Sequence, residues 1–307
     1  MGLDTSVQIN GIHFKNPVLP ASGTFGFGRE MADIWDIRAL GGIVSKGLTP
    51  LPREGNASPR VAESASGLLN SVGLQNPGIE AFIRHELPFM LSLGIPVVAN
   101  AAGHCVEDYV ILCQKLDPTG ISAIELNLSC PNVRSGCMSI GTDPEQVREV
   151  VRAARAATAK PLWVKLTPNV THVDEIAVAA QDAGADAVCL INTLLGMQID
   201  IRTRRPLLAN NTGGLSGPAV KPIAVRMVYE VAHAVRIPVI GIGGIQSAED
   251  AIEFLMAGAT AVQVGSANLI KPTACKDIIE NIEKYLQENE ISEIRDLIGV
   301  ARRWEQA

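Results

Sequence analysis

The chain has 307 residues, of which 47% are hydrophobic, and its formal net charge is −6. That length and hydrophobic content suffice for a large core, and single α/β barrels often reach this size. Nucleic acids and anionic membranes bind basic surfaces, so the acidic balance argues against both as partners. The apolar runs are also shorter than the ~20 residues that a membrane-spanning helix needs.

The N-terminal stretch and the cysteines indicate a cellular compartment. MGLDTSVQIN lacks the basic start and apolar run of a secretion signal. No two cysteines form a C-x-x-C pair, and their spacing fits neither a zinc site nor a cysteine-ligated iron–sulfur cluster. We therefore expect a cytoplasmic protein with reduced thiols and no bound metal. The cysteines are Cys105, Cys113, Cys130, Cys137, Cys189 and Cys275.

Short apolar runs rich in strand-forming residues recur along the chain, with helical stretches between most of them. They span residues 18–23, 42–47, 96–103, 123–129, 162–168, 187–193, 238–244 and 261–266. Near-continuous apolar strands alternating with helices indicate a parallel sheet that is covered on both faces. Eight such units favour a TIM (β/α)8 barrel, an α/β fold formed by residues 1–307 as a single domain. A doubly wound open sheet is the alternative.

Three of the intervening helices are predicted from their caps and apolar spacing. The stretch 142–157 has Thr142 as its expected cap and a proline in its first turn. The other two stretches begin with Thr171 and Ser247 as their expected caps, and each has an acid in the first turn and ends in glycine.

Two long segments, 48–76 and 194–217, are too polar and too rich in Gly and Pro for core helices. Long excursions in a compact domain are usually functional, so we expect both to contribute to a site.

In a TIM barrel the site lies at the carboxyl ends of the strands. Asparagines there offer donors and acceptors to a flat heterocycle with C=O and N–H edges, and lysines suit a carboxylate or a developing negative charge. Each residue alone could be a turn cap or a solvated charge, but their convergence on one barrel mouth favours a binding site. The strand-end residues are Ser22, Lys46, Asn100, Asn127, Lys165, Asn192, Gly243, Gly244, Gly265 and Ser266.

The glycines after the seventh and eighth strands, in GIGGI and VGSA, match the recurring phosphate site of this fold. Tight turns are the alternative explanation. A phosphate site beside a polar, planar pocket predicts flavin mononucleotide (FMN). GTFGFG at 23–28 has the wrong spacing for a dinucleotide-binding fingerprint, so no nicotinamide site is expected on this chain.

Cys130 follows the fourth predicted strand, in the stretch ELNLSCPN, and is a candidate for proton transfer. An unperturbed thiol titrates near ~8.5, so modest tuning lets it accept a proton near neutral pH. A nucleophilic cysteine would need a histidine partner, and no histidine ends a strand beside it, although His104 follows the third strand closely. We therefore predict a general base. Cys113 and Cys189 are expected to be buried structural cysteines.

The motifs NLSCPNV, LNSVGLQNPG, VKLTPN, INTLLGM, NTGGLSGPAVKPIA and GIGGI together resemble the dihydroorotate dehydrogenase family over nearly the whole chain. NPVLPASGTFGFG and GTDP are most similar to the NAD-linked type of the first class. The resemblance implies FMN-dependent oxidation of dihydroorotate to orotate in pyrimidine biosynthesis. It also implies a partner subunit that carries FAD and a 2Fe–2S cluster and passes electrons to NAD, and a homodimer of catalytic subunits within a heterotetramer.

The resemblance also implies the roles of individual residues. Cys130 would take a proton from the ring carbon next to the one that gives hydride, and Lys165 would stabilise the reduced flavin. Cys137 stands where glycine is usual, which restricts the backbone of its loop, and Ser71 replaces an expected alanine. FMN would be lined by Ser22, Lys46, Gly47, Asn100, Asn127, Lys165, Ile191, Gly217, Gly243, Gly244, Gly265 and Ser266. Dihydroorotate would be held by Lys46, Asn70, Ser71, Val72, Gly73, Leu74, Asn127, Asn192 and Thr193.

Four alternatives stay open at this point. A stand-alone, fumarate-linked enzyme of the first class would have the same site without a partner subunit. A dihydropyrimidine or dihydrouridine flavin oxidoreductase would act on another substrate, and the acidic charge disfavours a tRNA substrate. A non-enzymatic barrel and a flavin-free phosphate-binding barrel enzyme would both lack bound flavin.

Overall fold

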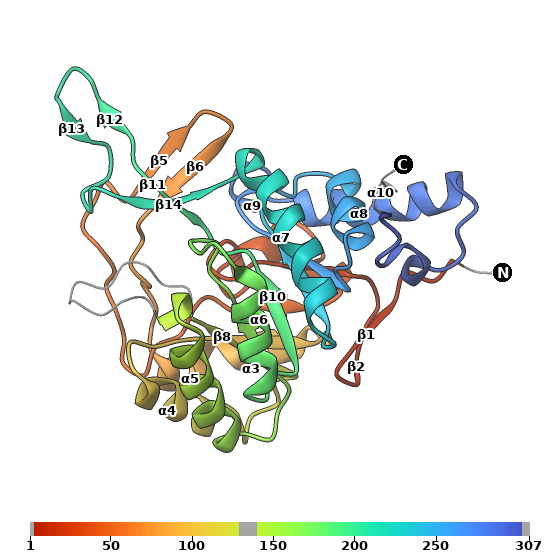
Figure 1. Ribbon diagram of the computed structural model, residues 1–307, viewed down its shortest axis with the longest axis horizontal. Coiled ribbons are helices and arrows are strands. Elements are labelled where there is room, and N and C mark those ends of the chain that lie inside the picture. Colours follow the sequence, from red (N-terminus) through yellow and green to blue (C-terminus); the bar gives the residue numbers. More distant parts are fainter. Residues whose placement is uncertain (1–2, 129–139, 303–307) are drawn as a thin grey trace.

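The computed structural model describes residues 3–128 and 140–302, and it has the predicted barrel (Figure 1). Its eight parallel strands follow one another around the sheet in chain order. The first and last of them also meet, since the Gly41 amide donates to the Val18 carbonyl oxygen (3.1 Å). A doubly wound sheet would reverse the strand order, so that alternative is wrong. The strands are β3 (Val18–Pro20), β4 (Ile43–Val44), β7 (Val97–Ala102), β8 (Ala123–Asn127), β9 (Leu162–Lys165), β10 (Ala187–Leu190), β15 (Val239–Ile242) and β16 (Ala261–Val264).

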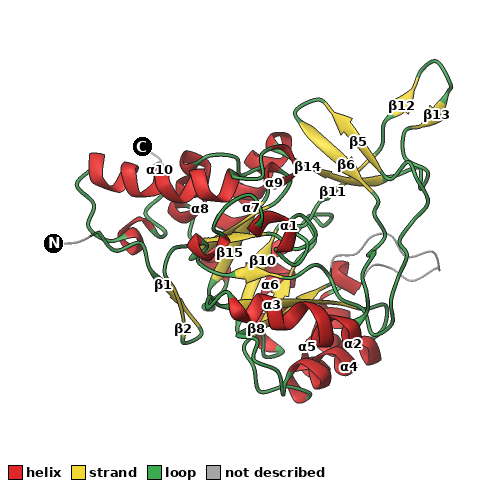
Figure 2. Ribbon diagram, turned by 180° about the vertical axis from the view of Figure 1, so that it is seen from behind, coloured by secondary structure: helices red, strands yellow, loops and turns green. Residues whose placement is uncertain are grey.

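Helices surround the barrel, as Figures 1 and 2 show from opposite sides. Each longer helix turns an apolar face inward at a spacing of three and four residues, as Val147, Val150, Val151 and Ala154 do. The longer helices are α4 (Val106–Leu116), α5 (Pro144–Ala156), α6 (Val173–Asp182), α7 (Lys221–Ala234), α8 (Ala248–Met256) and α10 (Ala274–Glu288). The shorter ones are α1 (Arg29–Ala32), α2 (Ile79–Ala81), α3 (Leu87–Ser92) and α9 (Ala267–Ile270). No helix in 3–128 or 140–302 is long and apolar enough to cross a membrane.

The helix caps agree with the predictions only in part. Ser247 caps α8 in a capping box, as predicted. Asp143, and not Thr142, caps α5, because its carboxylate accepts a hydrogen bond from the first helical turn (2.8 Å). α6 starts after His172 with no side-chain cap, so the expectation for Thr171 is also wrong.

The two long excursions fold against each other over the carboxyl ends of the barrel strands. β5 (Val61–Ser64) and β6 (Gly67–Asn70) come from the first excursion, and β11 (Leu194–Gly196) and β14 (Gly213–Ser216) from the second. They form one antiparallel sheet in the order β11-β14-β6-β5, here called the upper sheet. The upper sheet is visible above the barrel in Figure 1.

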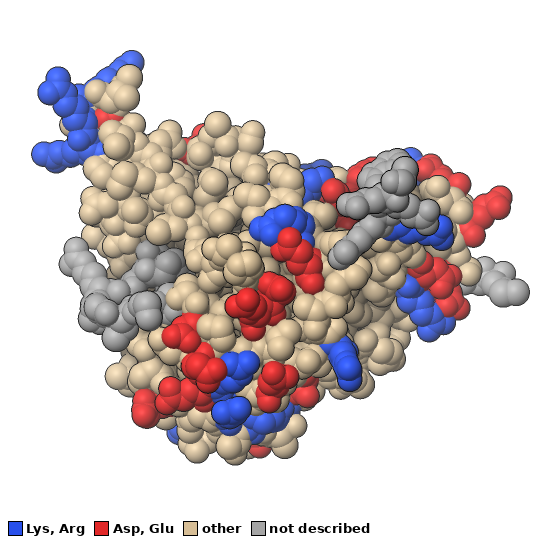
Figure 3. Space-filling model, viewed as in Figure 1, with Lys and Arg blue, Asp and Glu red and all other residues tan. Residues whose placement is uncertain are grey.

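A hairpin of β12 (Ile199–Asp200) and β13 (Arg205–Pro206) projects from the upper sheet. Arginines gather at its tip, whereas the neighbouring surface over the upper sheet is mostly uncharged (Figure 3). Ile199 and Ile201 of the hairpin are 53% and 87% exposed.

A second hairpin, of β1 (Val7–Ile9) and β2 (Ile12–Phe14), packs against the opposite end of the barrel. The ring centroids of Phe14 and Trp163 are 6.0 Å apart, and both side chains are fully buried. The Trp163 indole N–H donates to the Asn10 side-chain oxygen (2.9 Å). Asn10 in turn donates to the carbonyl oxygen of Asp186, just before β10 (2.8 Å). The hairpin therefore closes the amino end of the barrel, away from the upper sheet.

Removal of the Phe14 ring should destabilise the whole barrel. Phe14→Ala leaves a cavity beside Trp163, and we expect a loss of about 3–5 kcal/mol in the free energy of unfolding. His13→Ala is the matched control, because His13 neighbours Phe14 but is exposed, and its loss should stay within about 0.5 kcal/mol. Urea unfolding followed by circular dichroism measures both; equal midpoints for the two variants would contradict the assigned packing.

Candidate active site

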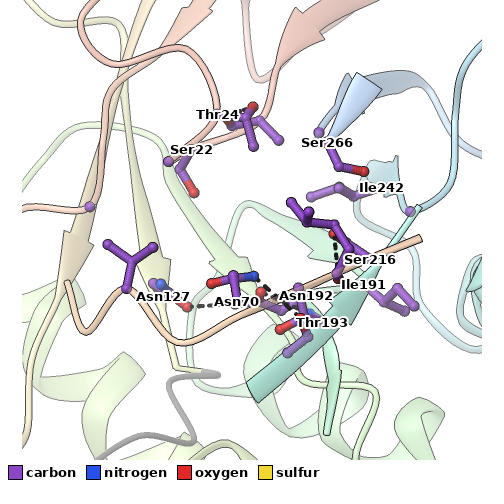
Figure 4. A pocket seen from close by; sticks show the side chains of 18 of the residues that line it. Ser22, Thr24, Asn70, Asn127, Ile191, Asn192, Thr193, Ser216, Ile242 and Ser266 are labelled. Atoms are coloured by element: carbon purple, nitrogen blue, oxygen red, sulfur yellow. Dashed lines mark hydrogen bonds between the residues drawn. The ribbon is translucent and has the colours of Figure 1, made fainter. Parts of the chain in front are cut away.

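A cavity of about 250 Å³ lies at the carboxyl ends of the barrel strands, beneath the upper sheet. Asn70, Asn127 and Asn192 line one side of it, and Ser22 and Ser266 lie across from them (Figure 4). Most residues that the sequence assigns to a site meet in this one wall. They are Ser22, Lys46, Gly47, Asn70, Val72, Gly73, Leu74, Asn100, Asn127, Lys165, Ile191, Asn192, Thr193, Gly243, Gly244, Gly265 and Ser266.

Two predicted site residues lie outside the cavity wall, and Cys130 is not among the described residues. Ser71 is fully buried but does not line the cavity, because side chains alternate along an extended chain and its neighbours Asn70 and Val72 point inward. Gly217 also lies outside the wall; its φ is 102°, and an added Cβ would be 2.7 Å from the Gly67 Cα. Cys130, like Cys137, lies outside the described residues.

The wall also contains residues that strand ends alone did not indicate. Thr24 follows β3, and Leu68 and Ser216 come from the upper sheet. Part of this group lies in the motif NTGGLSGPAVKPIA, which was the sequence feature that could have predicted it. The full set is Ala21, Gly23, Thr24, Val61, Leu68, Gly214, Leu215, Ser216, Val220, Ile242 and Leu269.

The asparagines of the wall hold one another in place. The Asn192 amide nitrogen donates to the Asn127 side-chain oxygen (3.2 Å), as drawn in Figure 4. The Asn192 side-chain oxygen accepts from the Thr193 backbone amide (2.8 Å). The Tyr109 hydroxyl fixes the end of β8 by donating to the Asn127 carbonyl oxygen (2.9 Å). Amides anchored in this way form a rigid polar surface for the edge of a flat ligand.

Two lysines bring positive charge to the cavity in different environments. Lys165 is 4% exposed; its ammonium donates to the Ser22 hydroxyl (3.2 Å) and lies 3.9 Å from a Glu125 carboxylate oxygen. Lys46 is only partly buried. Burial, and then the nearby charge of Arg60, lowers the pKa of Lys46 below its usual value. An anionic ligand beside Lys46 would reverse that effect by favouring the charged form.

Glu125 lies in the barrel interior below the cavity and has no exposed surface. Its carboxylate accepts hydrogen bonds from the Asn100 amide (2.6 Å) and the Gln263 amide (2.5 Å). Among residues 3–128 and 140–302, no donor reaches the Asn100 side-chain oxygen, which is also buried. Asn100 lines the cavity, and its unpaired oxygen lies beside Gly47 of the same wall, 3.0 Å from a Cβ built there.

Cys189 and Cys113 are both fully buried, as expected for structural cysteines. Burial, and then the neighbouring Glu125 carboxylate, raises the pKa of the Cys189 thiol well above its usual value. Burial raises the pKa of Cys113 to about 12. Both thiols therefore stay protonated, and neither lines the cavity.

The glycine turns beside the cavity have two different causes. Gly243 and Gly244 have φ angles of 127° and 76°, which favour glycine whatever binds nearby. Gly265 has no such constraint. A Cβ built there meets only the Ala21 Cβ, at 3.9 Å, so its absence keeps open space in the wall. Tight turns explain the first two glycines, whereas the third borders open space in the wall.

Comparisons with known proteins identify the family of the chain. A family model described as dihydroorotate dehydrogenase matches residues 4–286. The chain is 54% identical over 297 residues to the "Dihydroorotate dehydrogenase B (NAD(+)), catalytic subunit" of Geotalea uraniireducens, covering 96% of this chain and 97% of the relative. Relatives of the same name from Alkaliphilus oremlandii and Lachnoclostridium phytofermentans are 53% and 50% identical, over 95% and 98% of this chain and 97% and 100% of their own lengths. These matches confirm the resemblance seen in the motifs, and the chain belongs to the dihydroorotate dehydrogenase family.

Proposed function

We propose that this chain oxidises dihydroorotate to orotate, as the FMN-binding catalytic subunit of an NAD-linked enzyme of pyrimidine biosynthesis. The observation that carries the proposal is the convergence of Asn70, Asn127 and Asn192 with two lysines in one cavity. Dihydroorotate has a ring with alternating C=O and N–H groups and one carboxylate. Amides complement the ring edge, and Lys46 complements the carboxylate.

FMN fits the remaining wall by the chemistry of the residues present. The unused Asn100 oxygen suits a ring N–H, the Lys165 ammonium suits a ring edge that gains negative charge, and Gly265 leaves room for the ligand. When bound, FMN supplies the hydride acceptor. The residues that would hold it are Ser22, Lys46, Gly47, Asn100, Asn127, Lys165, Ile191, Gly243, Gly244, Gly265 and Ser266.

Cys130 is proposed as the general base of this reaction. β8 ends at Asn127, in the cavity wall, and Cys130 follows three residues later along the sequence. Its thiolate would remove a proton from one ring carbon while hydride leaves the neighbouring carbon, and a C=C bond forms between them. Lys46 and the asparagines would keep the substrate in place during both transfers.

A second polypeptide is proposed as the route for the electrons. The relatives are named catalytic subunits, which implies another subunit in those enzymes. We propose that this chain likewise works with a subunit that carries FAD and a 2Fe–2S cluster. Two catalytic chains would pair within a heterotetramer, and the assembly would be cytoplasmic.

Replacement of Cys130 separates proton transfer from binding. Cys130→Ala should keep FMN and orotate affinity but lower turnover by at least ~100-fold, the usual scale for a general base. Cys130→Ser should retain some activity, shifted to high pH because a hydroxyl is a weaker acid. Cys105→Ala is the control, since Cys105 is exposed and does not line the cavity. Near-normal turnover of Cys130→Ala at neutral pH would exclude the role.

The titration of Lys46 tests the substrate site without turnover. In the ligand-free protein Lys46 should lose its proton at lower pH than Lys221, whose pKa is raised by hydrogen bonds to Asp250 and then Glu253. Orotate should raise the pKa of Lys46, because its carboxylate favours the charged amine, and leave Lys221 unchanged. NMR of 13C-dimethylated lysines, assigned with Lys46→Arg and Lys221→Arg, follows both. If orotate left the Lys46 titration unmoved, Lys46 would not bind the carboxylate.

The electron acceptor distinguishes the proposed type from its alternatives. The isolated chain should reduce artificial dyes with dihydroorotate but should not reduce NAD at a useful rate, and addition of the partner subunit should start NAD reduction. Spectrophotometry at 340 nm, with and without the partner, measures this. Robust NAD reduction by the isolated chain would refute the partner route. Efficient fumarate reduction would instead favour the stand-alone enzyme.

A further inference from the structure

A layer of polar side chains crosses the barrel interior below the cavity. Glu125 on β8 is at its centre and interacts with residues from four other strands, one of which is the Cys189 thiol on β10. One carboxylate oxygen accepts from Asn100 on β7 (2.6 Å) and lies 3.9 Å from the Lys165 ammonium on β9. The other accepts from Gln263 on β16 (2.5 Å). All five side chains are almost completely buried.

The barrel itself does not require this layer. Interior positions of such barrels are usually filled by Val, Ile and Leu. A buried ion pair often stabilises a protein less than apolar side chains of the same volume would. Departures of this kind occur at functional sites, and two members of the layer, Asn100 and Lys165, line the cavity.

A carboxylate imposes a direction on its neighbours because it can only accept hydrogen bonds. Asn100 must turn its NH2 group toward Glu125, so its side-chain oxygen is left facing elsewhere. That oxygen is buried and has no donor within the described parts of the chain. Glu125 thereby fixes the orientation of an amide that could otherwise donate or accept, and leaves its oxygen as an unpaired acceptor beside Gly47 of the cavity wall, 3.0 Å from a Cβ built there.

The same carboxylate sets the net charge of the cavity floor, by which we mean the Lys165 ammonium and the Glu125 carboxylate beneath the cavity. Lys165 carries one positive charge, and Glu125 offsets it at 3.9 Å. In a poorly solvated interior, each of these charges acts strongly on a ring bound above them. Without Glu125, the floor would carry an uncompensated positive charge.

We propose that Glu125 is a positioning residue that fixes the acceptor orientation of Asn100 and limits the positive charge that Lys165 presents to bound flavin. The inference rests on the proposed FMN site. It assigns Glu125 control over the reduction potential of the flavin, although Glu125 itself does not line the cavity.

Glu125→Gln tests the inference because it keeps the shape of the side chain and removes its charge. Reduced flavin carries more negative charge than oxidised flavin, so the uncompensated Lys165 should favour the reduced form. We expect the ratio of reduced to oxidised FMN, at a fixed solution potential, to rise at least tenfold. For a two-electron couple that corresponds to about 30 mV or more. Dye-equilibrated photoreduction measures it without substrate; an unchanged or lower potential would overturn the proposal.

Two matched variants separate this role from a purely structural one. Glu125→Asp retains the charge and should keep the ratio within about threefold of the wild type. Gln263→Leu removes a hydrogen bond to the same carboxylate without changing the charge of the floor. It should lower the thermal midpoint but leave the ratio nearly unchanged. If all three variants lost thermal stability with no difference in potential, Glu125 would be structural only.

Glu125→Gln leaves the buried Lys165 ammonium without a nearby negative charge. If that prevents folding, a double variant still tests the proposal. Lys165→Gln alone should lower the reduction potential. Adding Glu125→Gln to that variant should raise the potential again, so that the ratio of reduced to oxidised FMN increases at least tenfold. Equal potentials for the single and double variants would overturn the proposal.

The wild type tests the underlying function separately. Purification without flavin, or flavin that dihydroorotate does not reduce, would remove the proposed function and this inference together. A wild type that passes both tests, beside a Glu125→Gln variant of unchanged potential, would remove this inference alone.

Discussion

Closure of the parallel sheet is the constraint on which the rest of the site depends. Because all eight barrel strands run in the same direction, their carboxyl ends must meet at one mouth. Asn100, Asn127 and Lys165 are separated in sequence by tens of residues, yet each ends or nearly ends a strand and so lines the same cavity. The hairpin with Phe14 closes the other end of the barrel, which leaves one open mouth for a ligand. The topology of the backbone thus brings these polar residues together, although they are far apart in the sequence.

The upper sheet gives this mouth its roof. Two excursions from different parts of the chain pair as β6 and β14, with Asn70 opposite Gly214. The two glycines of β14 allow that approach: a Cβ at Gly213 would lie 2.6 Å from the Asn70 carbonyl oxygen, and one at Gly214 would lie 2.0 Å from the Thr193 hydroxyl oxygen. Asn70 lies in the first excursion and Thr193 directly precedes the second, and close backbone packing therefore holds the two residues at one place. Larger residues in β14 would separate the roof from the barrel wall.

The sequence predicts the barrel well and its roof poorly, for a physical reason. Barrel strands are continuous apolar runs such as 123–129, flanked by helices with local capping signals such as Ser247, and those signals act over a few residues. Upper-sheet strands are three or four residues long, and their pairing joins positions as distant as Asn70 and Gly214. No local pattern encodes such a pairing. The same limit explains why Ser71 was wrongly expected in the cavity wall, because the direction of its side chain depends on the strand that precedes it. It also explains the wrong cap of α5, where two adjacent residues could both serve.

The strand ends in the sequence predict residues that line the cavity, but they do not predict Glu125, which lies beneath them. Asn100 and Lys165 are visible in the sequence as polar residues in apolar strands, whereas Glu125 reads as one polar position in an otherwise ordinary strand. Its importance follows only from the register that aligns β7, β8 and β9, with Asn100 opposite Glu125 and Asn127 opposite Lys165. In that register the buried carboxylate lies opposite Asn100 and two residues before the position that pairs with Lys165, and both Asn100 and Lys165 line the cavity. A layer of aliphatic side chains would fill the same volume, but it could not orient the amide or offset the charge. The polar interior is therefore better explained by the ligand it supports than by the stability of the barrel.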